Sequence, residues 1–227
     1  MKAAIFDMDG VIADTNPHHR ITWGEYARRF FNHDLTEDEF LQHVSGRTNA
    51  AIVTYLLNGK TLPAAEIDRL GDEKEALFRE VYAPHAQTVP GLEAFLKELK
   101  RNGVKTAVAT SAPTANLTFI LETLKLEPYF DVLLDITKVT QPKPHPEIYQ
   151  TAMRLLGVGP EASVVFEDFI PGIAAGRASG ARVVGVATTH PREELTMVDD
   201  VIRDFTEMSY ERFHRLLEPA GSPALGV

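Results

Sequence analysis

Two aspartates, Asp7 and Asp9, follow the apolar run Ala3-Ala4-Ile5-Phe6 and precede Gly10. An apolar run that ends in polar residues and a glycine is typical of a buried strand and the turn after it. Two carboxylates so close repel each other, so one of them takes up a proton or a cation neutralises the pair. Mg²⁺ suits such a pair because it needs few protein carboxylates and keeps some waters. Asp7 could then act as a nucleophile, since carboxylates carry phosphoryl groups as aspartyl-phosphates.

The Asp-x-Asp pattern has other interpretations when it is taken alone. Sugar-nucleotide transferases also hold metals with such pairs, and solvated aspartates in turns are commoner than either kind of site. The rest of the chain therefore has to decide between a catalytic pair and a solvated turn.

Further polar residues follow the ends of other expected strands. Ser111 follows one strand, Lys143 lies in the loop after the next, and Glu167 and Asp168 end a third. Ligands of open α/β sheets bind beyond the carboxyl ends of the strands, so we expect these side chains to converge on one crevice. Phosphoryl transfer needs such a set: a nucleophile, a proton donor, a metal, and cationic and hydroxyl groups around the phosphoryl oxygens.

Each of these residues also has a purely structural interpretation. Ser111 could cap the helix that begins near Thr114, and Lys143 could be a solvated loop charge. Glu167 and Asp168 could be an acidic pair that the dipole of a following helix favours. Their joint order on successive strand ends is much harder to obtain by chance, so we favour the catalytic set.

The elements that must position these residues change in character along the chain. From Asn16 to about His85 only helical patterns occur, and the first helix is expected to have Asn16 as its cap and Pro17 as its first residue. The expected apolar face of this helix, which runs to about residue 31, carries Trp23, Tyr26, Ala27, Phe30 and Phe31.

From Val89 onward strands and helices alternate. The expected strands cover 105–110, 132–135, 163–166, 182–186 and 201–202. The expected helices cover 92–102, 115–124, 146–156 and 171–179. Repeated strand-helix units of this length imply a parallel sheet with helices on both faces. We therefore predict an α/β fold, a doubly wound parallel sheet with an inserted all-helical cap.

The composition limits the partners of the protein. The chain has 227 residues, a formal net charge of −9 and no cysteine, so we expect no disulfides and no thiolate chemistry. An acidic chain without a clustered basic face argues against nucleic acid or an anionic membrane as a partner. We find no apolar run of membrane-spanning length and no secretory leader, and we expect a cytoplasmic monomer that binds a small molecule.

Four motifs together resemble the haloacid dehalogenase superfamily of Mg²⁺-dependent phosphotransferases, in particular its members with a helical cap after the first strand. The first and second motifs are Asp7-Met8-Asp9-Gly10-Val11 and Thr110-Ser111. The third and fourth motifs are Lys143-Pro144-His145-Pro146-Glu147-Ile148-Tyr149 and Phe166-Glu167-Asp168 followed by Pro171-Gly172-Ile173 and Ala178-Ser179-Gly180. The resemblance spans essentially the whole chain. It implies a Rossmann-like core over 1–13 and 87–217, a cap over 14–86 and a flexible tail over 218–227.

The resemblance also implies roles for the core residues. Asp7 would be the nucleophile and Asp9 the acid and base, with phosphate contacts from Ser111 and Lys143. Mg²⁺ would be held by Asp7, the Asp9 carbonyl and Asp168, with Glu167 close by. One departure concerns Phe169, because relatives commonly carry a small hydroxyl residue just after the acidic pair.

The cap resembles that of β-phosphoglucomutase-like proteins and the sugar-phosphate phosphatases around them, which implies substrate contacts from His19, Arg47 and Lys74. Alternatives are a histidine in a capping turn, an arginine in a loop ion pair and a snorkelling lysine. The sequence supports Lys74 independently, because a charge interrupts the expected apolar helix stripe of Ile67, Leu70, Leu77, Phe78 and Val81.

These observations predict a Mg²⁺-dependent phosphatase that hydrolyses a small phosphomonoester, expected to be a sugar phosphate, through an aspartyl-phosphate. The alternative is a phosphosugar mutase of the β-phosphoglucomutase type. Both activities need the same core residues, and they differ in whether water or a sugar hydroxyl meets the aspartyl-phosphate.

Overall fold

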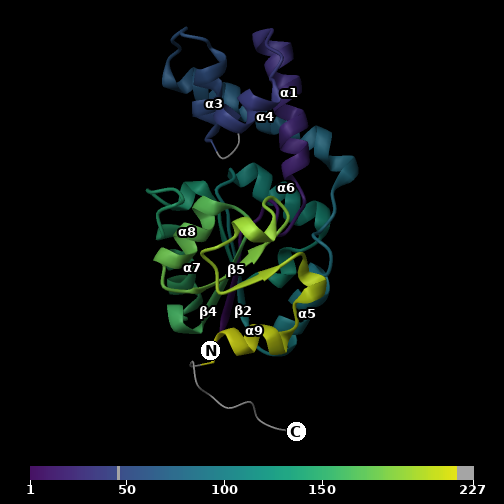
Figure 1. Cartoon of the computed structure of the whole chain (residues 1–227), viewed down its shortest axis with the longest axis vertical. Helices are drawn as coiled ribbons and strands as arrows, with labels where there is room; N and C mark the ends of the chain where they lie inside the picture. Colours follow the sequence, from purple (N-terminus) through teal and green to yellow (C-terminus); the bar gives the residue numbers. More distant parts are fainter. Residues whose placement is uncertain (45–46, 219–227) are drawn as a thin grey trace. The chain divides into compact units, whose positions relative to one another are not determined.

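A computed structural model describes residues 1–44 and 47–218 of the chain (Figure 1). The chain divides into two compact units: the core, which comprises Met1–Asp14 and the chain from Gln87 onward, and the cap, Thr15–Ala86. The pair Ser45-Gly46, whose residue types predict a turn, lies outside the described residues, as does the expected tail over 218–227 apart from Glu218.

The core is built on one parallel sheet. Within the described residues its strands are β1 Ala3–Phe6, β2 Lys105–Ala109, β3 Val132–Leu134, β4 Ser163–Glu167, β5 Arg182–Val186 and β6 Asp200–Ile202. Their order across the sheet is β3-β2-β1-β4-β5-β6. The strand order reverses between β1 and β4, which makes the carboxyl ends of these two strands the expected ligand-binding crevice of a doubly wound sheet.

The two faces of the sheet bury different side chains because successive residues of a strand point to opposite faces. Ile5 on β1 and Val165 on β4 are register partners, and both join the apolar cluster that includes Ile173 of a covering helix. Phe6 and Phe166, the next register pair, stack with their ring centroids 4.8 Å apart in a separate aromatic group. The strands are therefore apolar on both faces, as a buried parallel sheet requires.

Helices cover both faces of this sheet (Figure 1). The core helices are α5 Leu92–Arg101, α6 Thr114–Leu124, α7 Glu147–Leu156, α8 Ile170–Ala178 and α9 Tyr210–Leu216. The α7 and α8 helices supply side chains to the cluster around Ile5, whereas Phe95 of α5 and Phe213 of α9 join the aromatic group around Phe6. The predicted doubly wound α/β fold is confirmed, and the predicted strands and helices that flank the site agree with the observed bounds to within about one residue.

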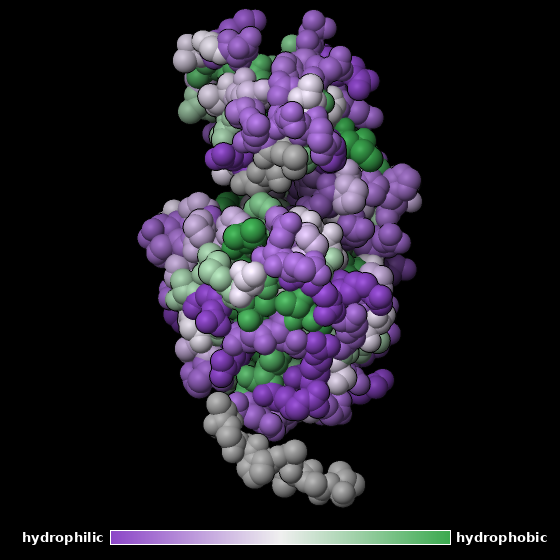
Figure 2. Space-filling view, in the orientation of Figure 1, coloured by the Kyte–Doolittle hydropathy of each residue, from purple (hydrophilic) through white to green (hydrophobic). Residues whose placement is uncertain are grey.

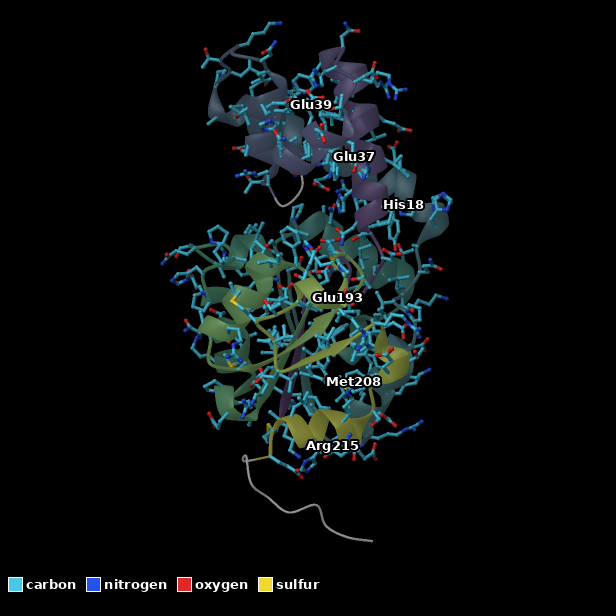
Figure 3. The ribbon with its side chains drawn as sticks, in the orientation of Figure 1. His18, Glu37, Glu39, Glu193, Met208 and Arg215 are labelled. Carbon is cyan, nitrogen blue, oxygen red and sulfur yellow. The ribbon has the colours of Figure 1, made fainter. Side chains whose placement is uncertain are left out.

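The cap is helical, as predicted. Its helices are α1 Asn16–Phe31, α2 Glu37–Glu39, α3 Asn49–Leu56 and α4 Ala64–Tyr82, with a turn of π-helix over Phe40–Val44 and a 3₁₀ turn over Ala83–His85. A capping box opens α2, because the Thr36 hydroxyl accepts from the Glu39 N–H and the Glu39 carboxylate accepts from the Thr36 N–H. Glu39, labelled in Figure 3, also accepts from Tyr55 at 2.6 Å, which links α2 to α3.

Three details of the predicted cap helices were wrong. Asn16 is the first residue of α1 and Thr15 takes the cap position, because the Thr15 carbonyl already accepts from the N–H groups of His18 and His19. Phe30 is 49% exposed, although its ring lies 4.5 Å from that of Tyr26. On α4, Lys74 and Phe78 are buried as predicted, and Ile67, Leu70 and Leu77 pack partly buried against the apolar cluster of the cap. The predicted stripe omitted the other buried residues, Gly71, Glu75 and Tyr82, and included Val81, which is only partly buried.

Hydrophilic residues predominate on the face of the molecule drawn in Figure 2, and apolar residues form smaller patches among them. In the described part of the chain, no helix combines the length and the apolar character that crossing a bilayer requires.

Candidate active site

The acidic residues of the predicted site meet where the strand order reverses. Asp7 directly follows β1, Glu167 is the last residue of β4 and Asp168 follows it. The Asp7 N–H donates to the Phe166 carbonyl at 3.0 Å, so the pairing of the two strands continues up to the site. All three side chains are buried, with residue exposures of 8%, 1% and 2% in the order given. The pairing of β1 with β4 therefore brings together carboxylates that lie far apart in the sequence.

Lys143 connects two of these carboxylates. Its ammonium group donates to Asp7 Oδ1 at 2.6 Å, to Glu167 Oε1 at 2.7 Å and to the Ala109 carbonyl at 3.0 Å. These bonds use all three protons of the ammonium and hold it at the ends of β1, β2 and β4. Lys143 is thus a buried partner of the carboxylates, and its interpretation as a solvated loop charge was wrong.

The loop that carries Lys143 is anchored at the start of α7. The Glu147 carboxylate accepts from the N–H groups of Thr140 and Gln141 at 3.0 and 2.9 Å, and from the Thr140 hydroxyl at 2.9 Å. These hydrogen bonds close the loop on both sides of Lys143. The loop therefore presents a fixed cation to the site rather than a mobile one.

Glu167 is enclosed by its neighbours. The Tyr149 hydroxyl of α7 donates to Glu167 Oε1, and the Phe169 N–H donates to Oε2 at 3.4 Å. A Cβ atom on Gly172 would lie 1.8 Å from Oε1, so only glycine fits at this point of α8. The carboxylate is therefore held in one position by α7, α8 and Lys143.

Burial sets the protonation of the site. It raises the pKa of Asp7 to about 7, with further increases from the charges of Glu167 and Asp9 and an opposing effect of Lys143. Burial, Glu167 and Asp7 together raise the pKa of Asp168 well above its usual range. Burial by itself would lower the pKa of Lys143, but the charges of Asp7 and Glu167 outweigh it and raise that pKa, so the lysine stays protonated.

The three carboxylates fit a divalent cation. Asp7, Glu167 and Asp168 each offer an oxygen atom, and these atoms lie within 4.8 Å of one another. When all groups are ionised, the cluster including Lys143 keeps a formal charge of −2. Carboxylate oxygens are the ligands that Mg²⁺ and similar hard cations prefer, and such a cation would cancel the excess charge. The donor set is therefore suitable for the metal that the motifs predict.

Asp9 lies in the turn after β1 and is partly exposed. The turn is closed by Gly10, which has φ +76° and donates its N–H to the Ala13 carbonyl at 2.8 Å. The Thr188 hydroxyl donates to the Gly10 carbonyl at 2.6 Å and so ties the turn to the loop after β5. Glycine suits the left-handed conformation of this turn, which holds Asp9 near Asp7 on the sheet's carboxyl edge.

Ser111 follows the end of β2 and is exposed. The turn that carries it is fixed by Thr110, whose hydroxyl accepts from the Ala112 N–H at 3.0 Å. The alternative role of Ser111 as a helix cap was wrong, because α6 begins at Thr114 with Pro113 in the cap position and no side-chain cap. The Ser111 hydroxyl is therefore presented at the same edge of the sheet as the carboxylates.

In the cap, His19 and Lys74 come together. The Lys74 ammonium lies 2.8 Å from Nδ1 of His19 and donates to Glu75 Oε1 at 2.9 Å, and Asn49 Nδ2 donates to the same Glu75 oxygen at 2.8 Å. The His19 ring stacks on Phe78 with centroids 3.7 Å apart. Lys74 is 1% exposed, so the interpretation as a snorkelling lysine was wrong.

Arg47 is placed differently from the other two cap residues. It is exposed, and its guanidinium reaches the Gln42 carbonyl at 3.5 Å. Among the described residues, no hydrogen bond joins Arg47 to His19 or Lys74. The loop ion pair that is the alternative for Arg47 is not observed among the described residues.

Sequence reasoning missed three residues that contact the predicted ones. Tyr149 was quoted within a motif but given no role, although a buried tyrosine usually finds a hydrogen-bond partner. Glu75 could have been found, because it shares the helical spacing of Gly71 and Phe78 and lies beside Lys74. The hydroxyl of Thr189 donates to Asp168 from the loop after β5, and no sequence signal pointed to it.

Comparison with known proteins places the chain in a family. Residues 4–186 match the family described as haloacid dehalogenase-like hydrolase. The match covers most of the chain and includes the core residues that the motifs predicted for the site, Asp7, Asp9, Ser111, Lys143, Glu167 and Asp168. The protein belongs to this family, and the resemblance inferred from the motifs is confirmed.

Individual relatives cover nearly the whole chain. Validoxylamine A 7'-phosphate phosphatase of Streptomyces hygroscopicus subsp. limoneus is 33% identical over 211 residues, which cover 92% of this chain and 96% of the relative. Phosphorylated carbohydrates phosphatase of Thermotoga maritima is 35% identical over 189 residues, with coverages of 82% and 85%. The crystal structure of a β-phosphoglucomutase from Clostridium difficile is similar with a TM-score of 0.82 and 25% identity, and the coverages are 96% and 97%.

Proposed function

We propose that the protein is a Mg²⁺-dependent phosphatase that hydrolyses a small phosphomonoester, a sugar phosphate, through an aspartyl-phosphate on Asp7. The observation that carries this proposal is the Asp7 carboxylate, bonded to the buried Lys143 at 2.6 Å beside Glu167 and Asp168. The relative named phosphorylated carbohydrates phosphatase supports the substrate class.

In the proposed reaction a carboxylate oxygen of Asp7 forms a bond to phosphorus, and the bond from phosphorus to the substrate oxygen breaks. Asp9 donates a proton to the leaving oxygen and so becomes a base. In the second step Asp9 takes a proton from water, whose oxygen attacks phosphorus and releases phosphate from Asp7. Ser111 and Lys143 would contact the phosphoryl oxygens and stabilise the charge that develops on them.

The metal would be held by the carboxylates of Asp7 and Asp168 and the carbonyl of Asp9, with Glu167 close by. When bound, Mg²⁺ would neutralise the phosphoryl oxygens and the carboxylates that face them. Lys143 already reduces the repulsion between Asp7 and Glu167, and its charge opposes the rise in the Asp7 pKa that burial causes, so it favours the ionised form that a nucleophile needs.

We propose that the cap supplies substrate recognition through His19, Arg47 and Lys74. The cluster of His19 and Lys74 offers an imidazole and an ammonium group in fixed positions. Arg47 offers an exposed guanidinium, which suits an anionic or hydroxyl-rich part of a substrate.

The test is hydrolysis of a panel of phosphate esters, with sugar phosphates and p-nitrophenyl phosphate, in Mg²⁺ and in EDTA. We expect phosphate release in Mg²⁺, its loss in EDTA and its recovery when Mg²⁺ is added back. Turnover that is undiminished after chelation would remove the metal-dependent mechanism, and no hydrolysis of any ester would remove the phosphatase.

A mutase of the β-phosphoglucomutase type is the second candidate, favoured by the structural similarity of a solved β-phosphoglucomutase and by the His19 and Lys74 pair. The decisive measurement is product analysis with β-glucose 1-phosphate and a trace of glucose 1,6-bisphosphate. Slow phosphate release from many sugar phosphates would support the phosphatase. Fast formation of glucose 6-phosphate with little free phosphate would replace it with the mutase.

A further inference from the structure

The residue after the acidic pair, Phe169, cannot donate a hydrogen bond to Asp168 through its side chain. It occupies the cap position of α8, where hydroxyl and carboxamide side chains are favoured, and α8 has no side-chain cap. The buried Asp168 carboxylate nevertheless needs partners that fix its orientation, because a buried carboxylate without hydrogen bonds is unfavourable.

Thr189 supplies such a partner from the loop after a neighbouring strand. Its hydroxyl donates to Oδ2 of Asp168, although the two residues are 21 positions apart in the chain. Thr189 lies three residues beyond the end of β5, which is the neighbour of β4 in the sheet. We propose that Thr189 is a positioning residue for the proposed metal site, which orients the Asp168 carboxylate in place of a hydroxyl at position 169.

The segment that carries Thr189 is fixed before and after this residue. The Ala187 N–H donates to the Ile202 carbonyl at 2.8 Å, and the Thr188 N–H donates to the Val186 carbonyl at 2.9 Å. The Thr188 hydroxyl bonds the Gly10 carbonyl at 2.6 Å. The backbone is thus tied to β6 and to the turn of Asp9, so the Thr189 hydroxyl meets Asp168 from a defined position.

Phe169 contributes to this arrangement through packing. Its ring stacks on His190 with centroids 5.3 Å apart and an interplanar angle of 29°. Nδ1 of His190 lies 2.9 Å from Oε2 of Glu194, a neighbour of the Glu193 labelled in Figure 3. Phe169, which has no hydroxyl of its own, therefore packs against the residue next to Thr189. In this proposal Phe169 holds the segment in place and Thr189 orients the Asp168 carboxylate.

The affinity of a metal site depends on the orientation of its carboxylate ligands, which is fixed by the groups that hydrogen-bond to them. Loss of such a hydrogen-bond partner commonly lowers metal affinity by about 10- to 100-fold. Replacement of threonine by valine keeps the shape and removes only the hydroxyl. The inference rests on the metal site of the proposed function, and binding of Mg²⁺ can be measured without turnover.

The experiment is isothermal titration of Mg²⁺ into the full chain with Thr189→Val, Thr189→Ser and the unsubstituted protein. We expect Thr189→Val to bind Mg²⁺ about 10- to 100-fold more weakly and Thr189→Ser to stay within about threefold of the unsubstituted protein. Thr54→Val is the matched control, because it removes the hydroxyl of an exposed threonine that donates to the Ala50 carbonyl of its own helix in the cap. Thermal unfolding in EDTA establishes that each variant is folded.

A second variant tests the role assigned to Phe169. Phe169→Ala should weaken Mg²⁺ binding less than Thr189→Val does, and the double variant should bind no more weakly than Thr189→Val alone, because both changes act through one hydrogen bond. Additive losses would overturn the link between Phe169 and Thr189. Equal affinity of Thr189→Val and the unsubstituted protein would overturn the role of Thr189, whereas an unsubstituted protein that binds no Mg²⁺ would overturn the proposed metal site itself.

Discussion

The core and the cap each bury a lysine that bonds a carboxylate, but the groups around the two lysines differ. In the core, Lys143 bonds Asp7 and Glu167, and Asp168 adds a third carboxylate. In the cap, the contacts between described residues join Lys74 to the Glu75 carboxylate and the His19 imidazole, and Glu75 to the Asn49 carboxamide.

This difference indicates that the two clusters differ in whether they require further protons or a cation to balance their buried charges. The described contacts of the cap pair one buried ammonium with one buried carboxylate. A cluster with more carboxylates than cations must bind protons or a metal, as in the core. The core cluster is therefore suited to reaction with a metal and a phosphoryl group, and the cap cluster is suited to present fixed groups to a ligand.

The largest expected effect is that of Asp7→Asn, which removes the proposed nucleophile. We expect a loss of about 10⁴-fold or more in kcat for the best ester of the panel. Asp34→Asn, at an exposed ion pair with Arg28 in the cap, is the control and should retain activity. Comparable phosphate release by Asp7→Asn and the unsubstituted protein would show that the core cluster is not the reactive one.

Lys143→Met makes the imbalance in the core larger. With its cation removed, Asp7 and Glu167 become uncompensated buried charges, and the free energy of unfolding should fall by about 3–5 kcal/mol in EDTA. The measurement is chemical denaturation at pH 8. Lys97→Met, at the exposed pair with Glu93 on α5, should leave stability nearly unchanged. A small change in the free energy of unfolding of Lys143→Met would mean that repulsion between the buried carboxylates does not destabilise the core cluster.

The pH dependence of stability distinguishes the two clusters further. Since the pKa of Asp7 rises from 3.8 to about 7 on folding, the folded metal-free protein keeps a proton that the unfolded chain releases. The contribution of Asp7 to stability is therefore full below about pH 4 and is lost as the pH rises towards 7. In EDTA this corresponds to a fall in Tm of about 2–4 °C per pH unit within that window.

The control for this prediction is Asp7→Asn, which has no titratable group at the position. Its Tm in EDTA should therefore fall less between about pH 4 and 7 than the Tm of the unsubstituted protein. Saturating Mg²⁺ should also remove the part of the fall that Asp7 causes, because a bound cation favours ionised carboxylates. Parallel Tm curves for the two proteins between pH 5 and 7 in EDTA would contradict the raised pKa of Asp7.

The smallest expected effect is that of Glu75→Gln in the cap. Gln keeps the shape and can still accept from Asn49 and Lys74, so the loss is that of a charge-assisted hydrogen bond, about 1–3 kcal/mol in the free energy of unfolding. This loss should not depend on Mg²⁺, in contrast to the effect of Lys143→Met. If the stability loss of Glu75→Gln changed with Mg²⁺, the cap cluster and the proposed metal site would be energetically coupled, contrary to this expectation.

The sequence alone determined the architecture of the core and the residue types that stand at its strand ends. Apolar runs that end in polar residues predict strands because burial on both faces demands apolar side chains, and glycines such as Gly157 and Gly180 mark helix ends through their positive φ. The residue types at the strand ends, Asp7, Lys143 and Glu167, then indicate phosphoryl chemistry. These signals are local, so they can be read without knowing which strands are neighbours.

Only the tertiary structure decided which polar groups touch. Lys143 and Asp7 lie 136 residues apart, and their contact depends on the strand order and on the loop that Glu147 anchors. Thr189 reaches Asp168 only because β5 pairs with β4. On α4 the packing of the cap buries Glu75 together with Lys74 and Phe78, although the apolar pattern did not include it. The physical reason is that a hydrogen bond depends on tenths of an ångström in the placement of two elements, whereas periodicity specifies only which face of each element is buried.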